Sequence, residues 1–180
     1  MPHAARHSST TASTARSTTR STGTAARSTR STGTDAVKLL KDDHKEVKAL
    51  FKQYDKLAKA EDESREELAR EICAMLTAHT TIEEEIFYPA AREVLEDDDV
   101  DLVDEAAVEH ATAKDLIAQI EGSSRDSELY DAKMKVLSEY IDHHVKEEEE
   151  ELFPKVKKAG LDAKAVGAEL AERKAALTAQ

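Results

Sequence analysis

From residue 35 onward, apolar side chains recur at three- and four-residue steps, which is the spacing of one face of an α-helix. The first stripe predicts a helix that Asp35 caps and that ends near Ala60. A capping box of Ser64 and Glu67 then predicts a second helix, which we expect to end at Pro89. Two long helices joined by so short a loop predict an antiparallel hairpin.

The second half of the chain follows the same plan. A third stripe predicts a helix that stops at Gly122, and Asp126 or Ser127 opens a fourth helix. We expect the fourth helix to end around Pro154 and Gly160. The second turn is predicted to be irregular, because its two helices place their histidines at different distances from it.

A short fifth helix is expected after the second hairpin. Asp162 can cap it, and Val166, Leu170 and Leu177 would face inward. The chain therefore predicts an all-α fold: an up-down-up-down four-helix bundle with a short C-terminal helix packed across it.

The two hairpins are related by an internal repeat of 65 to 66 residues. His44 falls on His110 at the first offset, and His79 on His144, Glu83 on Glu148 and Pro89 on Pro154 at the second. A repeat of this length indicates two similar hairpins related by a twofold axis. Counting residues to the first turn places its two histidines at one level.

Polar side chains interrupt the apolar stripes at that level on all four helices. They are His44, His79, Glu83, His110, His144 and Glu148. Burial of imidazoles and carboxylates without partners is costly, whereas metal ions satisfy all six groups at once. Imidazole and carboxylate without thiolate suit iron, with manganese or zinc open on ligand type alone. A metal-free helical interaction domain is the alternative, which the polarity of the stripes disfavours.

Several neighbouring polar residues are predicted to lie outside this group. His143 does not follow the repeat and is expected to lie behind the metal ligands or at the surface. The acidic runs over residues 83–85 and 147–151 should mostly face solvent, apart from Glu83 and Glu148, with Glu84 and Glu147 at the margin between core and solvent. Lys48 and Lys114 are likewise expected at the surface.

Composition separates the first 34 residues from the rest. This stretch holds five Arg, no acidic residue and, past Met1, no Leu, Ile, Val, Phe or Tyr, so we expect a disordered tail over residues 1–34 and one domain over residues 35–180. Removing those five Arg leaves 21 basic against 38 acidic residues, a net charge of −17, which argues against general nucleic-acid binding by the domain. The tail could be a linker or contact nucleic acid or an acidic partner. A transit peptide is disfavoured because the tail lacks an apolar helix face.

The motifs together resemble one known family. Asp43-His44, His79-x-x-x-Glu83 before Phe-Tyr-Pro, Glu109-His110 and His143-His144-x-x-x-Glu148 before Leu-Phe-Pro are similar to a haemerythrin-like, HHE cation-binding domain over roughly residues 35–177. The resemblance implies two non-haem iron ions joined by an oxo or hydroxo bridge. It also implies that His44 and His79 ligate one iron, that His110 and His144 ligate the other, and that Glu83 and Glu148 bridge them.

Two positions depart from the oxygen-carrying members of that family. Those members resemble this pattern but have a further His and an Asp where this chain has Lys114 and Glu149. The resemblance therefore implies a protein that binds or reacts with dioxygen, peroxide or nitric oxide in stress or iron homeostasis, rather than an oxygen carrier. Peroxide consumption is a narrower prediction, and a non-catalytic iron or oxygen sensor or iron-handling module is the alternative.

The remaining features concern location and assembly. The single Cys73 excludes an intrachain disulfide and a Cys-ligated cluster, fits a reducing compartment and is expected in the core. No run approaches the roughly 20 apolar residues of a membrane span. We expect a cytoplasmic protein that is a monomer or a weak homo-oligomer.

Overall fold

A computed structural model describes residues 34–60 and 62–179, and these residues form helices joined by turns, with no β-strand among them. The elements are α1 (Ala36–Lys59), α2 (Arg65–Ile82), the π-helical turn η1 (Glu83–Phe87), α3 (Tyr88–Val94), α4 (Asp97–Glu121), α5 (Tyr130–Glu147), the π-helical turn η2 (Glu148–Leu152), α6 (Phe153–Ala159) and α7 (Ala163–Thr178). The predicted tail over residues 1–34 lies outside the described residues, apart from Thr34.

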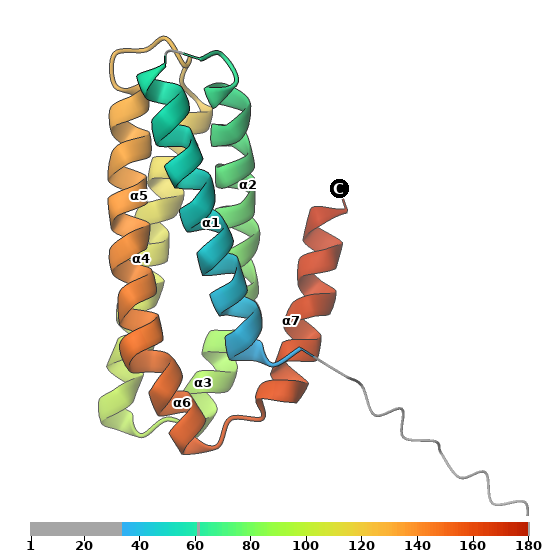
Figure 1. The fold of residues 1–180 in the computed structure, drawn as a ribbon. Coiled ribbons are helices and arrows are strands. Elements are labelled where there is room, and N and C mark those ends of the chain that lie inside the picture. The colour runs from blue at the N-terminus through green and yellow to red at the C-terminus, as the bar shows by residue number, and fades with distance from the viewer. Residues whose placement is uncertain (1–33, 61, 180) are drawn as a thin grey trace, which may run out of the picture. The chain divides into compact units, whose positions relative to one another are not determined.

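Four long helices form the predicted up-down-up-down bundle (Figure 1). Helix α1 packs against α2 and α5, while α4 packs against the same two helices, so the four surround one core. Figure 1 shows both hairpin turns at one end of the bundle, with α3 and α6 at the other. The fold class predicted from the hydrophobic pattern is therefore confirmed.

The predicted caps are partly correct. The side chain of Asp35 accepts a hydrogen bond from the Lys38 amide at 3.1 Å, and Asp162 caps α7 in the same way. The capping box at Ser64 was wrong, because the Ser64 side chain caps no backbone amide and instead donates to Asp62 at 2.7 Å. Ser64 already has helical dihedral angles, which turn its hydroxyl away from the next turn.

The prediction that the second helix ends at Pro89 was also wrong. The chain passes through η1 and continues as α3 to Val94, with Pro89 in the first turn of α3. Pro154 occupies the same position in α6, which ends at Gly160 in the left-handed conformation, φ 91°. Proline is tolerated there because a first-turn amide needs no partner within the helix, and here the π-turn resets the hydrogen-bond pattern just before it.

The second hairpin turn is irregular, as predicted. Helix α4 stops at Gly122 as expected, but α5 begins at Tyr130 rather than at Asp126 or Ser127. Consecutive turns fill the interval, with the Ser127 amide donating to Ser124 at 2.9 Å and the Tyr130 amide to Ser127 at 3.0 Å. The extra residues account for the unequal distances of the two histidines from this turn.

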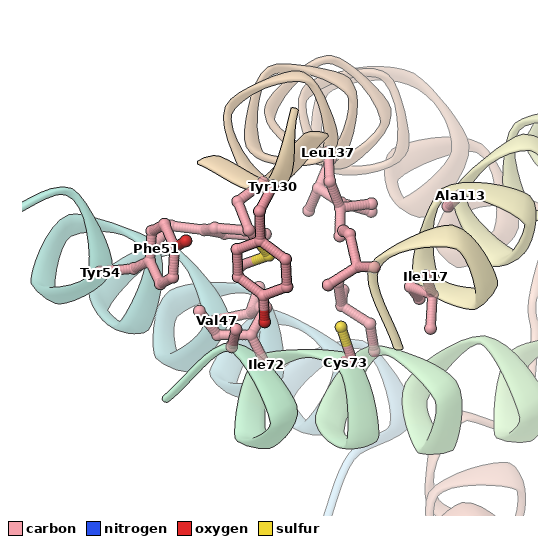
Figure 2. Close-up of a cluster of buried hydrophobic side chains, with 14 of the residues drawn as sticks. Val47, Phe51, Tyr54, Ile72, Cys73, Ala113, Ile117, Tyr130 and Leu137 are labelled. Carbon is pink, nitrogen blue, oxygen red and sulfur yellow. The ribbon is translucent and has the colours of Figure 1, made fainter. Parts of the chain in front are cut away.

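Two apolar clusters fill the bundle, and the buried polar residues fall between them on every long helix. The first cluster lies toward the hairpin turns and includes Phe51, Ile72 and Leu137 (Figure 2). The second lies toward α3 and α6 and includes Leu40 and Phe87. Burying polar side chains inside an apolar core costs free energy unless they have partners. The contacts of this polar layer therefore indicate its function.

Cys73 is fully buried in the first cluster, as predicted, and it is a free thiol. Burial raises the pKa of this thiol to about 12, so it is not poised for reactivity.

Helix α7 lies along α1 and α2 (Figure 1). Val166 and Leu170 are buried in the second cluster, while the predicted Leu177 packs against it from a half-buried position. Gly167 permits close approach, because a Cβ there would lie 1.9 Å from the carbonyl oxygen of Thr34. Within the described residues, no helix has the length and hydrophobicity that crossing a membrane requires.

Candidate metal centre

The structure brings all six predicted site residues together inside the bundle. None exposes more than 5% of its surface, and Glu83 is fully buried. His44 comes from α1, His79 from α2, His110 from α4 and His144 from α5, while the two glutamates begin η1 and η2. The internal repeat therefore places one histidine of each long helix at a common level.

The first group consists of His44, His79, Glu83 and Glu148. Nε2 of His44 lies 3.1 Å from Nε2 of His79 and 3.3 Å from Oε2 of Glu148. Nε2 of His79 lies 3.1 Å from Oε2 of Glu83. These four residues offer ligand atoms within 4.8 Å of one another, which suits one metal ion.

The second group consists of His110, His144 and Glu83, and Glu148 lies beside it. The Nε2 atoms of His110 and His144 are 3.1 Å apart. Oε2 of Glu83 lies 3.4 Å from Nε2 of His110, and Oε2 of Glu148 lies 3.6 Å from Nε2 of His144. Each carboxylate thus lies between two histidine pairs, which is the position that a bridging ligand requires.

A π-turn begins at each of the two glutamates. The Tyr88 amide donates to the Glu83 carbonyl, and the Phe153 amide donates to the Glu148 carbonyl, each across five residues. Such a turn inserts one extra residue into the helix and rotates the side chains that follow it. Single π-turns are frequent at functional sites, and here both begin at a predicted metal-binding residue.

A carboxylate faces the outer nitrogen of each histidine. The Nδ1 atoms pair as His44 with Glu149 at 3.0 Å, His79 with Asp43 at 3.3 Å, His110 with Glu84 at 3.1 Å and His144 with Glu109 at 2.8 Å. An Nδ1–H that donates to a carboxylate fixes the ring and leaves Nε2 free to bind a metal.

Glu84, predicted to be marginal between core and solvent, and Glu149, predicted to face solvent, both pair with histidines. Both residues lie within the π-turns, and each side chain is only about one-third exposed. The repeat could have predicted the four carboxylates that face the Nδ1 atoms. Asp43 and Glu109 are 66 residues apart, and Glu84 and Glu149 are 65 apart.

The electrostatics of the site favour cations. Burial lowers the pKa of His79, but Glu83 and Asp43 outweigh it and raise that pKa to about 10. Burial likewise opposes ionisation of Glu83, yet the charges of His79 and His110 hold the pKa of Glu83 well below its usual range. Carboxylates that stay ionised inside a core need positive charge beside them.

In the part of the chain that the structure describes, three buried carboxylate oxygens of the site have no hydrogen bond. Among the described residues, no donor completes a hydrogen bond to either oxygen of Glu83 or to Oε2 of Glu148. Unsatisfied buried acceptors are rare and costly. A metal ion between the histidine pairs would satisfy them, so the residues present fit the metal that the sequence implies.

The comparison with protein families bears directly on this site. The model of the Hemerythrin HHE cation binding domain family matches residues 35–156. The chain belongs to this family. It is also similar to the crystal structure of a hemerythrin HHE cation-binding domain-containing protein from Mycobacterium kansasii, with a TM-score of 0.68, 21% identity and coverage of 81% of this chain and 88% of that chain. At that identity the likeness shows the fold alone. No match is found among curated protein sequences.

Two lysines donate hydrogen bonds to carboxylates that surround this HHE site. Lys114, predicted at the surface, is half-buried and donates to both oxygens of Glu84, at 2.5 and 2.7 Å. Lys174 of α7 donates to Oδ1 of Asp43, whose Oδ2 accepts from His79. The sequence did not predict the contact of Lys174, because only the docking of α7 brings this lysine to Asp43 of α1.

His143 lies at the surface of the bundle, within the range of positions predicted for it. Its side chain is 59% exposed, and its Nε2 lies 3.2 Å from Glu147 and 3.8 Å from Glu109. Together these three residues offer one more cluster of metal-ligating side chains. Exposure and an ordinary i, i+4 pair make it a weaker candidate than the buried groups.

Tyr88 is a further residue of the site that the sequence did not single out. It is 3% exposed, and its hydroxyl lies 3.1 Å from Nε2 of His110 and donates to Oε1 of Glu148 at 2.9 Å. Its position in the repeat is occupied by Phe153 in the other half, 65 residues on. At this position, the two halves of the site therefore differ by a hydroxyl group.

Proposed function

We propose that this domain holds two non-haem iron ions and binds or reacts with a small oxidant, namely dioxygen, peroxide or nitric oxide. The observation that carries this proposal is the placement of Glu83 and Glu148 between two histidine pairs. His44 and His79 would hold one ion, His110 and His144 the other, and the two carboxylates would bridge them. Imidazole and carboxylate ligands suit iron, which would supply redox chemistry when bound.

The ligand set leaves room for an exogenous molecule. Four protein groups around a six-coordinate ion leave positions for a bridging oxygen and a small ligand. A small cavity between α4, α5 and η2 reaches His144 and Glu148 and is lined in part by Leu102 and Leu152. Its lining also includes Glu105, Glu109 and Glu147, and its small size suits a molecule of two or three atoms rather than an organic substrate.

Reconstitution with ferrous iron under anaerobic conditions tests the metal assignment. We expect about two iron ions per chain by elemental analysis, and a near-ultraviolet oxo-to-iron band after oxidation. His79→Ala and His144→Ala should each lose iron, while the exposed His143→Ala should not. One metal ion per chain or none would overturn the proposal.

Peroxide consumption is tested separately. The iron-loaded protein should remove hydrogen peroxide, and the zinc-loaded protein, which has the same fold but no redox metal, should not. If iron-loaded protein leaves peroxide unchanged while holding two irons, metal binding stands and peroxidase or catalase chemistry does not.

A second candidate function is an iron or oxygen sensor, or an iron-handling module, without turnover. The hydrogen bonds from Lys174 to Asp43 and from His79 to Asp43 favour it, because they connect α7 to the proposed metal site. Metal binding should then increase hydrogen-exchange protection in α7, and Lys174→Met should abolish that increase. Equal exchange in the metal-free and iron-loaded proteins would exclude this candidate.

A further inference from the structure

A surface cluster of metal-ligating side chains lies beside the second half of the proposed metal centre. Nε2 of His143 is 3.2 Å from Oε1 of Glu147 and 3.8 Å from Oε1 of Glu109. The three residues offer ligand atoms within 4.8 Å of one another. One imidazole and two carboxylates are ligands that suit a divalent cation such as Fe²⁺ or Mn²⁺.

Glu109 connects this surface cluster to the buried site. Only 8% of its surface is exposed. Its Oε2 accepts a hydrogen bond at 2.8 Å from Nδ1 of His144, which is a proposed metal ligand. Its Oε1 faces Nε2 of His143 at 3.8 Å, which is longer than a hydrogen bond, so this oxygen has lone pairs available for a cation. One carboxylate therefore contacts both the exposed cluster and a buried histidine.

The small cavity between α4, α5 and η2 shares residues with the surface cluster. Glu109 and Glu147 line it together with the exposed Glu105 and the buried His144 and Glu148. Its lining therefore combines carboxylates near the surface with two proposed ligands of the buried ions. An opening lined by negative charge raises the local concentration of cations, which is what a path for metal ions requires.

The other half of the repeat provides an internal comparison. Ala78 and Ile82 occupy the positions of His143 and Glu147, 65 residues earlier, and both are buried. Neither side chain can ligate a metal. The His143 side chain, in contrast, is 59% exposed, and that of Glu147 is 34% exposed.

Helix α7 accounts for this difference in exposure. It packs against α1, α2 and η1, on the side of the bundle that the first half of the repeat forms (Figure 1). There Asp43 corresponds to Glu109, and its Oδ1 accepts a hydrogen bond from Lys174 of α7. The lysine neutralises the carboxylate that would otherwise attract a cation. The cation-binding face is therefore the one formed by α4 and α5.

We propose that Glu109, His143 and Glu147 form a weak outer site through which ferrous iron enters the buried centre. This inference rests on the proposed two-iron function. Three protein ligands leave the remaining positions of a six-coordinate ion to water, so the outer site exchanges its ion readily. It therefore sets the rate of iron loading and leaves the final content at two irons per chain.

The rate of iron loading tests the proposal. Metal-free protein is mixed anaerobically with ferrous iron, and a fast chelator traps unbound iron at timed intervals. The double variant His143→Ala/Glu147→Gln should load about 10-fold more slowly than wild type, because steering by a charged opening raises association rates by at least this factor. Glu139→Gln removes the same charge from an exposed glutamate of the same helix and should load as wild type does.

The final iron content separates the two proposals. Equal loading rates in wild type and the double variant, with two irons in both, would overturn the entry site and leave the two-iron function intact. Wild-type protein that binds no iron would refute the proposed function and the entry site with it.

Mn²⁺ binding to protein that already holds two oxidised irons detects the outer site directly. Added Mn²⁺ should occupy this site, and the electron paramagnetic resonance signal of free Mn²⁺ should decrease accordingly. The double variant His143→Ala/Glu147→Gln should lose this binding, whereas Glu139→Gln should keep it. Two-iron wild type that binds no more Mn²⁺ than the double variant would contradict the proposal.

Discussion

The Nδ1–H of His144 donates to Oε2 of Glu109 at 2.8 Å, and both side chains are buried. Asp43 stands in the same relation to His79 in the other half of the repeat. Outer carboxylates of this kind hold the imidazole ring in place and raise its basicity as a ligand.

Glu109→Gln is therefore expected to weaken metal binding without unfolding the bundle. Loss of an outer carboxylate typically costs about 10- to 100-fold in metal affinity, which competition with a chelator would measure. Glu105→Gln, one turn earlier on the exposed face of α4, is the matched control and should bind metal as the wild type does. Equal affinities for the two variants would show that Glu109 does not support the metal site.

Lys174→Met should destabilise the metal-free protein, because it leaves the buried Asp43 carboxylate without its lysine. Removing a charged hydrogen-bond partner from a buried group costs roughly 1–3 kcal/mol, measurable by urea unfolding in the presence of a chelator. Lys164→Met changes an exposed lysine on the same helix and should stay within about 0.5 kcal/mol of the wild type. A loss no larger than that of the control would mean that α7 is held by its apolar contacts alone.

Gly167→Ala should disturb the docking of α7. The added methyl would meet two backbone atoms, the Thr34 oxygen at 1.9 Å and the Ala36 nitrogen at 2.7 Å, neither of which can rotate away. This clash should outweigh the gain of about 1 kcal/mol in helix propensity. We expect a lower melting temperature and faster hydrogen exchange in α7. Ala168→Ser, at the adjacent exposed position, should leave both unchanged.

The free energy of unfolding of the metal-free protein should fall as the pH rises above 6.5. The raised pKa of His79, about 10 against 6.5 in a free side chain, means that its contribution to folding is complete below pH 6.5 and is lost as the pH rises through 10. The lowered pKa values of Asp43 and Glu83 act in the opposite sense, since their contribution is present above the ordinary carboxyl range and is lost in acid.

Urea unfolding across the pH range, with a chelator present, would measure both losses. His79→Gln should remove most of the alkaline loss, whereas the exposed His143→Gln should not. An alkaline profile that is identical in wild type and His79→Gln would contradict the assignment of that loss to His79.

The sequence by itself determined the helices, the repeat and the six buried residues, because helix faces and side-chain burial follow from local spacing. A His and a Glu four residues apart share a face whatever surrounds them, and a 65-residue repeat brings two such pairs to one level. The same local reasoning misplaced Pro89 as a helix end and Glu149 as a solvated residue, because it assumed a regular helix through both π-turns.

Only the tertiary structure decided which further groups touch the site. Glu84 and Glu149 face histidines of other helices, and Lys174 reaches Asp43 across 131 residues of sequence. Tyr88, the first residue of α3, donates to Glu148 of η2 across 60 residues of sequence. These contacts depend on helix rotation and docking, which the packing of the whole core sets, so no local pattern could determine them.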